Sequence, residues 1–345
     1  MSRIKTSSAL PAVSRPGWSP SSSRAPSEGR GSRSLDFAIL CERYREGPEG
    51  LGFDPRKSPE VIARRLGVSP ATVRRRINEW RTQGFYRGCD VLPHPELMGG
   101  RLVVRVLDFP DAVAQERALG PLRLMDGVIQ IVSSRSMLLV VYFVDSTAQA
   151  ERRLMQLRGI EGIREIGSEM RLVYPPCSRK MSRADWRLVQ ALRRNPDAKL
   201  ADLARDVGQS ERTTSRRFDE LLDSGAIMFD PIFDYSRFSQ TLAELVVYLD
   251  SPTRLEEAGS QIRTLFPQSE HAWGASPSDL EDQAGSVQFL VCARTVAELE
   301  DRAARVAHLP GVEQAMLWYG RAIVPVQGWL NERIEGILKA DAPRN

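Results

Sequence analysis

The segment 63–69, Ala-Arg-Arg-Leu-Gly-Val-Ser, returns at residues 204–210 as Ala-Arg-Asp-Val-Gly-Gln-Ser. The two copies are 141 residues apart, and the same shift continues without gaps, so that Arg75 corresponds to Arg216. An internal repeat of this kind marks a duplicated structural unit. The chain is therefore expected to contain the same fold unit twice.

Each copy has the pattern of two helices joined by a short turn. In the first copy a serine followed by a proline opens each helix, at 58–59 and at 69–70, and Gly67 supplies the backbone freedom that ends the first helix. The apolar residues of the second helix fall at i, i+4 and i+7, on one face; they are Val73, Ile77 and Trp80. The opposite face must then point outward, which is typical of a helix-turn-helix.

The outward face of the second helix carries the residues that we predict to contact DNA. Arginine and asparagine suit guanine and adenine edges in the major groove, where a recognition helix presents its N-terminal residues. The predicted DNA-binding residues of the first copy are Ser69, Ala71, Thr72, Arg74, Arg75, Arg76, Asn78 and Arg81. Those of the second copy are Ser210, Arg212, Thr213, Ser215 and Arg216. The stretch 84–92 is expected to form a wing or linker, with Arg81 and Arg87 near phosphates. The alternative is a helical hairpin with solvated arginines.

The two copies differ in charge. Residues 56–87 hold nine Lys or Arg and two Asp or Glu, a net charge of +7. Residues 197–228 hold five Lys or Arg and seven Asp or Glu, a net charge of −2. Neutralisation of phosphates supplies most of the non-specific affinity for DNA. We therefore predict that the first copy dominates attachment to DNA.

A different pattern, βαββαβ, follows each helix-turn-helix. The first set is expected as strand 101–108, helix 111–120, strands 128–134 and 137–144, helix 147–157 and strand 163–174. The second is expected as strands 242–250, 269–274, 287–293 and 312–324, with helices near 253–265 and 295–307 and a final helix at 327–338. The predicted fold class is α+β, with two winged helix-turn-helix domains alternating with two ferredoxin-like domains.

Length and composition fit several domains in one chain. With 345 residues the chain is too long for one compact core. The expected divisions are a tail at 1–33, helix-turn-helix domains at 34–95 and 177–238, and ferredoxin-like domains at 96–176 and 239–345, the last with a C-terminal helix. The tail is rich in Ser, Pro and Arg, and its only acid is Glu28, which predicts disorder; an organelle transit peptide is the alternative.

Several classes of protein and site lack support in the sequence. No apolar stretch approaches the ~20 residues that cross a bilayer, so no membrane partner is expected. The four cysteines have no CxxC pair and the three histidines are widely separated, so neither a metal site nor a cofactor is predicted, and a reducing cytoplasm fits best. No GxxxxGK[ST] or GxSxG motif occurs. We therefore expect no catalytic residues and no enzyme.

The first copy resembles the Lrp/AsnC family of transcription regulators. The matching residues are Leu35-Asp36 with Ile39-Leu40, Ile62-Ala63, the run from Leu66 to Ile77, and Gly84. The resemblance covers nearly everything after the tail, and it implies double-stranded DNA as a partner, a small-molecule effector at the ferredoxin-like domains, and a homodimer or higher oligomer formed through them. The family normally has one such unit per chain, so the two ferredoxin-like domains here are expected to pair internally before the chain associates further.

The effector loop departs from the family's pattern, which usually has a glycine and an aspartate. In the first repeat the corresponding loop reads Ser133-Ser134-Arg135-Ser136, with neither residue, and in the second repeat the loop 274–279, Gly-Ala-Ser-Pro-Ser-Asp, is longer. Ser134 and Arg135 are candidates for a different, acidic ligand, and a tight turn between two strands is the alternative.

Two rivals to the regulator remain open. Siroheme decarboxylases resemble the same scaffold, also occur as fused pairs, and use basic and histidine residues around the tetrapyrrole; His271 with Trp273 lies where such a residue would be expected. Against this enzyme, the arginine-rich face at 70–78 would be unnecessary, and the first repeat has no matching histidine. The other rival is a ligand-sensing adaptor that has lost DNA binding, which the +7 charge of residues 56–87 disfavours.

Overall fold

The computed structural model describes residues 35–44, 53–134, 137–172, 174, 177, 179–251, 254–266, 270–277, 286–320 and 322–340. The predicted tail at 1–33 and the candidate Arg135 lie outside the described residues. Across the described part of the chain, no helix is long and apolar enough to span a membrane.

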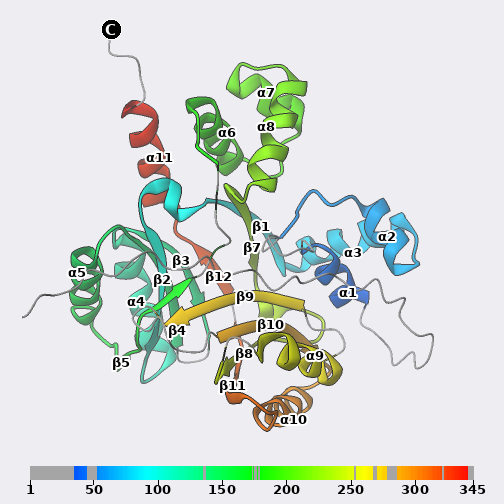
Figure 1. The fold of residues 1–345 in the computed structure, drawn as a ribbon, viewed down its shortest axis with the longest axis vertical. Coiled ribbons are helices and arrows are strands. Elements are labelled where there is room, and N and C mark those ends of the chain that lie inside the picture. Colours follow the sequence, from blue (N-terminus) through cyan, green and yellow to red (C-terminus); the bar gives the residue numbers. More distant parts are fainter. Residues whose placement is uncertain are drawn as a thin grey trace, which may run out of the picture. The chain divides into compact units, whose positions relative to one another are not determined.

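Each repeat begins with three helices, the two that were expected and one that precedes them (Figure 1). They are α1 (Leu35–Glu42), α2 (Pro59–Leu66) and α3 (Pro70–Gln83) in the first repeat, and α6 (Arg183–Arg194), α7 (Leu200–Val207) and α8 (Glu211–Asp223) in the second. The turn between the second and third helix starts at Gly67 and at Gly208, both with φ of +67°, a left-handed conformation that favours glycine. The repeated glycine therefore fixes the same turn in both units.

The strands that follow the third helices pair with each other. β1 (Tyr86–Pro93) and β7 (Ile227–Phe233) form an antiparallel two-stranded ribbon, with Val91 opposite Phe229. The stretch 84–92 was expected to form a wing or linker. It contains the strand β1, which pairs with β7, the matching strand of the other repeat. The rings of Phe85 and Phe233 stack at 4.8 Å between centroids beside this ribbon.

Two ferredoxin-like domains follow the ribbon strands, each after a 3-10 turn, η1 (Pro95–Met98) or η2 (Tyr235–Arg237). The first contains β2 (Arg101–Asp108), α4 (Ala112–Leu124), β3 (Val128–Ser133), β4 (Met137–Val144), α5 (Thr147–Arg158), β5 (Glu165–Ile166) and β6 (Met170–Leu172). The second contains β8 (Thr241–Leu249), α9 (Leu255–Leu265), β9 (Glu270–Pro277), β10 (Ser286–Ala293), α10 (Val296–Ala307), β11 (Val312–Trp318) and β12 (Ala322–Pro325), and α11 (Gly328–Ala340) comes last. The α+β fold class is confirmed.

The last strand of each ferredoxin-like domain differs from the prediction of one continuous strand. Each is broken in two, and the second piece pairs with the other domain: β6 with β9, and β12 with β3. At the second break, a Cβ on Gly320 would lie 2.8 Å from the Tyr235 ring, so glycine lets the chain pass close to that ring. Each domain thus lends one strand piece, β6 or β12, to the sheet of the other. This exchange leaves fewer unpaired strand edges, and it produces the internal pairing of the two domains that we expected.

The exchange joins both domains in one ten-stranded sheet, with the path β11-β8-β10-β9-β6-β2-β4-β3-β12 and β5 beside β2. The path begins and ends on β11 and β12, which are consecutive in the chain. Apolar side chains on one face of the sheet pack under helices of their own domain, in two separate clusters. Those on the other face join a third cluster with the β1–β7 ribbon and the helix-turn-helix units. The ribbon therefore lies between the helix-turn-helix units and the sheet.

Candidate nucleic-acid interface

The helix α3 has one buried and one exposed face. Val73, Ile77 and Trp80 are buried, which confirms the apolar pattern. The exposed face lines an open depression of about 560 Å³. Its lining residues are Ala71, Arg74, Arg75, Asn78, Glu79, Thr82 and Gln83. Four of the predicted contact residues, Ala71, Arg74, Arg75 and Asn78, therefore lie together on one exposed surface.

The two central arginines of this face make exposed ion pairs with neighbouring glutamates. Arg74 lies 2.5 Å from Glu60 on α2, and Arg75 lies 2.7 Å from Glu79 one turn further along α3. Exposed ion pairs contribute about 0–1 kcal/mol. Phosphates or base edges can therefore take over these guanidinium groups at little cost.

Three predicted contact residues, Ser69, Thr72 and Arg76, also make contacts within the fold. The Ser69 hydroxyl accepts a hydrogen bond from the Thr72 amide at 3.1 Å and so caps α3, and it also bonds the Thr72 hydroxyl. Arg76 lies 3.7 Å from Asp36 on α1, which also accepts a hydrogen bond from Trp80. Sequence spacing put Arg76 beside Arg75, but the helical rotation turns it toward α1.

Arg81 and Arg87, predicted to lie near phosphates, pair with acids of the second repeat. Arg81 lies 3.0 Å from Asp197, and Arg87 lies 2.6 Å from Asp234. Both side chains are about half exposed, at 49%. They hold the first helix-turn-helix against the second repeat while remaining open to solvent.

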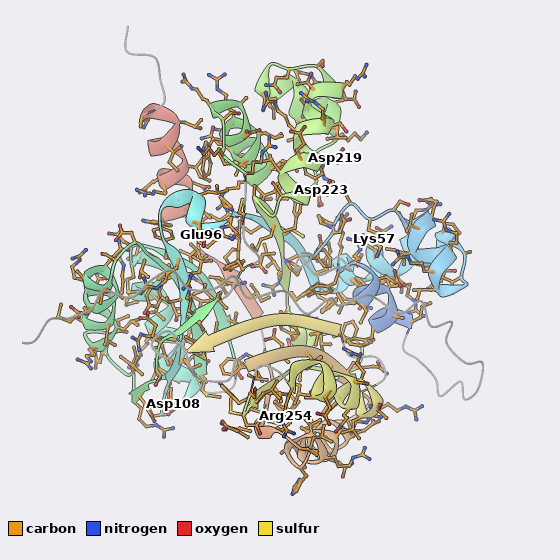
Figure 2. The ribbon with its side chains drawn as sticks, in the orientation of Figure 1. Lys57, Glu96, Asp108, Asp219, Asp223 and Arg254 are labelled. Atoms are coloured by element: carbon orange, nitrogen blue, oxygen red, sulfur yellow. The ribbon has the colours of Figure 1, made fainter. Side chains whose placement is uncertain are left out.

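The helix α8 has the same architecture with a different surface. Ser210 caps it through the Thr213 amide at 3.2 Å, and Arg217 pairs with Asp185 on α6 at 3.0 Å, as Arg76 pairs with Asp36. Arg212 and Arg216 are exposed and Thr213 and Ser215 are partly buried. The exposed acids of this helix are Glu211 at its start and Asp219 and Asp223 in its second half, the last two labelled in Figure 2. These carboxylates would repel phosphates.

The effector candidate Ser134 is buried, at 4% exposure. Its hydroxyl donates a hydrogen bond to the Tyr319 carbonyl at 2.8 Å, and its own carbonyl accepts one from Gln115. Ser134 therefore joins the β3–β4 turn to the end of β11, and its hydrogen-bonding groups are already used.

Sequence reasoning missed two carboxyl groups on the inner face of the sheet and ribbon. Asp230 on β7 is 8% exposed and accepts a hydrogen bond from Gln130 at 2.6 Å. Glu244 on β8 accepts one from the Tyr235 hydroxyl at 3.1 Å. Burial, with the charges of Asp90 and Glu244, raises the pKa of Asp230 to about 8, and burial also raises the pKa of Glu244. A lone acid inside an apolar strand run was the signal available in the sequence.

Comparison with known proteins gives one family match and several structural ones. A family described as winged helix-turn-helix DNA-binding matches residues 181–228, in the second repeat. No curated protein matches the chain. The solved structure of the siroheme decarboxylase NirDL aligns with 88% of this chain and 97% of its own, at 14% identity and a TM-score of 0.47. Escherichia coli AsnC aligns with 43% of this chain and 97% of its own, at 19% identity and a TM-score of 0.29. A transcriptional regulator from Neisseria meningitidis, solved with L-Met, aligns with 44% of this chain and 94% of its own, at 19% identity and a TM-score of 0.28.

One expectation from the sequence is corrected by these findings. The chain was expected not to be an enzyme, but the NirDL structures, which align with 88% of it, are those of an enzyme. That expectation is withdrawn. The family match, by contrast, agrees with the positions of helices α6, α7 and α8. Residues 181–228 therefore have the three helices of a helix-turn-helix domain, and they match the winged, DNA-binding class.

Proposed function

We propose that the protein is a DNA-binding transcription regulator of the Lrp/AsnC type, and that α3 makes its principal contacts with DNA. The observation that carries this proposal is the exposed face of α3, where Arg74, Arg75 and Asn78 lie together. Arginine and asparagine are the side chains that make bidentate bonds to guanine and adenine. Ala71 and Thr72 lie at the start of the same helix, where they suit contact with a thymine methyl group.

The second helix-turn-helix plays the smaller part in this proposal. Arg212 and Arg216 are exposed cations of α8, but Glu211 directly precedes Arg212 in the chain and Asp219 is exposed further along the helix. Salt-dependent affinity for DNA grows with the number of phosphates neutralised. The first unit therefore anchors the protein, and the second adds a weaker contact through Arg212, Thr213, Ser215 and Arg216.

We also propose that the domains span residues 34–95, 96–176, 177–238 and 239–345, that a small-molecule effector binds the protein, and that chains associate through the ferredoxin-like domains. The four cysteines, Cys41, Cys89, Cys177 and Cys292, are all free thiols, which supports a reducing cytoplasm.

Tetrapyrrole decarboxylation, which the name of one solved relative specifies, is the alternative. The cavity between the β1–β7 ribbon and the ten-stranded sheet, which Asp230 and Glu244 line, holds about 100 Å³, whereas pockets for drug-sized ligands hold roughly 300–1,000 Å³. Its charged groups are acids, which would repel tetrapyrrole carboxylates. Conversion of siroheme to a decarboxylated product by the purified protein would overturn this argument.

Two matched substitutions test the unequal roles of the helix-turn-helix units. Arg75 and Arg216 occupy equivalent positions, and each pairs with a glutamate four residues later. We expect Arg75→Ala to weaken binding to a genomic fragment selected by the wild-type protein about tenfold or more, since a good bidentate base contact contributes about 1–3 kcal/mol. Arg216→Ala should change the affinity less than about threefold. Fluorescence anisotropy at fixed salt measures both, and a larger loss for Arg216→Ala would contradict the proposal.

A further inference from the structure

A cavity of about 100 Å³ lies between the β1–β7 ribbon and the inner face of the ten-stranded sheet. Apolar residues of the sheet, such as Val104 on β2 and Leu290 on β10, form part of its wall. A cavity of ~150 Å³ admits benzene. A cavity of this size therefore suits a molecule of about four non-hydrogen atoms.

The charged groups of the cavity wall are both acidic. Asp230 contributes from β7 and Glu244 from β8, and the wall contains no Lys, Arg or His among the described residues. Asp90 on β1 adds a third carboxylate near Asp230, but Asp90 has its own cation, Arg193, at 2.8 Å. Asp230 and Glu244 accept hydrogen bonds only from neutral groups in the described part of the chain, those of Gln130 and Tyr235. Their negative charges, when present, are not balanced locally.

Aromatic side chains line the rest of the cavity. Tyr44, Tyr174, Tyr235 and Trp318 contribute to the wall. Aromatic faces attract organic cations through the ring quadrupole, more strongly where water is excluded. Two carboxyl groups with four aromatic rings make a wall that favours an ammonium group over a neutral or anionic one.

The indole of Trp318 is a second, independent feature of the cavity wall that points to a ligand. Trp318 is 8% exposed, and its Nε1 is buried with no hydrogen-bond acceptor in the described part of the chain. A buried N–H group without a partner is uncommon in folded proteins. An oxygen atom of a ligand in the cavity would supply the acceptor.

We propose that this cavity binds a small organic cation that also carries an oxygen acceptor, such as a short amino alcohol. The ammonium group bonds Asp230 and Glu244 against the aromatic wall, and the oxygen accepts from Trp318. A metal ion is a poorer fit, because no group of three metal-binding His, Cys, Asp or Glu side chains gathers among the described residues. The site stands apart from DNA binding and holds whether or not the protein binds an operator.

The proposed binding is expected to depend on pH. Burial raises the pKa of Asp230 to about 8, so the empty site holds a proton at neutral pH. A cation that pairs with the carboxylate displaces that proton, and its affinity must rise with pH up to about 8. Glu244, whose pKa burial also raises, acts in the same direction.

Isothermal titration of the full-length protein with 2-aminoethanol tests the proposal. The probe has four non-hydrogen atoms and keeps its charge through pH 8. We expect saturable binding at pH 8, at least about tenfold weaker binding at pH 6, and none by ethylene glycol, the neutral isostere. Equal binding of both probes, or no saturable binding of 2-aminoethanol at pH 8, would overturn the proposal.

Three variants locate the site. Asp230→Asn should lower the affinity at least about tenfold and remove most of its pH dependence. Trp318→Phe keeps an aromatic ring but removes the N–H. It should lower the affinity for 2-aminoethanol several-fold and leave the affinity for ethylamine, which lacks the oxygen, unchanged. Asp206→Asn, at an exposed acid on α7, is the matched control and should bind as the wild type does. Unchanged binding by folded Asp230→Asn would refute the assignment.

Discussion

Arg193→Met is expected to lower the free energy of unfolding by about 3–5 kcal/mol, because it leaves a buried carboxylate without its cation. Arg193 and Asp90 are 5% and 3% exposed, and Arg193 Nη1 lies 2.8 Å from Asp90 Oδ1. The same guanidinium donates to the Val91 carbonyl and to Asn331 on α11. The residue therefore joins α6, β1 and the C-terminal helix.

Urea unfolding followed by circular dichroism measures this loss. Arg194→Met is the matched control, because the side chain of Arg194, next to Arg193 in the chain, is exposed. This change should alter the stability by less than about 0.5 kcal/mol. Burial already raises the pKa of Asp90 although Arg193 opposes it. Without Arg193 that pKa rises further, so the loss should be smaller at pH 5 than at pH 8. A second change, Asp90→Asn, should restore much of the stability, and equal losses in both arginine variants would contradict the account.

Asp230→Asn is expected to stabilise the protein at pH 8 by a few kcal/mol while having little effect near pH 4. The difference in unfolding free energy between the variant and the wild type should grow by about 1.4 kcal/mol per pH unit at most. In the folded chain the pKa of Asp230 is raised to about 8 from an ordinary 3.8, mainly by burial. The folded state then keeps a proton that the unfolded state releases, so stability falls as the pH rises from about 4 to about 8. Asparagine has no such proton and can still accept from Gln130.

Urea midpoints of the wild type and Asp230→Asn at pH 5, 6, 7 and 8 test this difference. The two should diverge steadily as the pH rises. Asp206→Asn, at an exposed site, should follow the wild type throughout. Parallel curves for wild type and Asp230→Asn would show that the Asp230 carboxyl is not held protonated in the folded protein.

The local parts of the fold could be predicted from the sequence. The Ser-Pro starts, the glycine at 67 and the i, i+4, i+7 spacing of α3 are short-range signals, and each has its counterpart in the structure. The pairing of β1 with β7 and the exchange of β6 and β12 could not be predicted, because they depend on contacts between residues more than 100 positions apart. The hydrophobic pattern of a strand says which residues are buried but does not name the neighbouring strand.

The candidate DNA-binding surface was predictable to a similar extent. Arg74, Arg75 and Asn78 were recognised because the apolar stripe fixes which face of α3 is exposed. Arg76 was misplaced because it lies at the edge of that stripe, where a partner on another helix, Asp36, decides its direction. Asp230 and Glu244 were missed because a lone acid in an apolar strand signals a buried carboxyl group but does not show which groups face it until the neighbouring strands are known.

Binding of the purified protein to its own upstream DNA, and to a genomic fragment library, tests the central claim most directly. Footprinting and mobility shift over a salt titration should reveal a discrete protected site with half-sites about 34 Å apart, affinity that falls steeply with salt, and stronger protection of one half-site than the other. Failure to bind any fragment at low salt, by a protein that is folded, would contradict the claim that the α3 surface reads DNA.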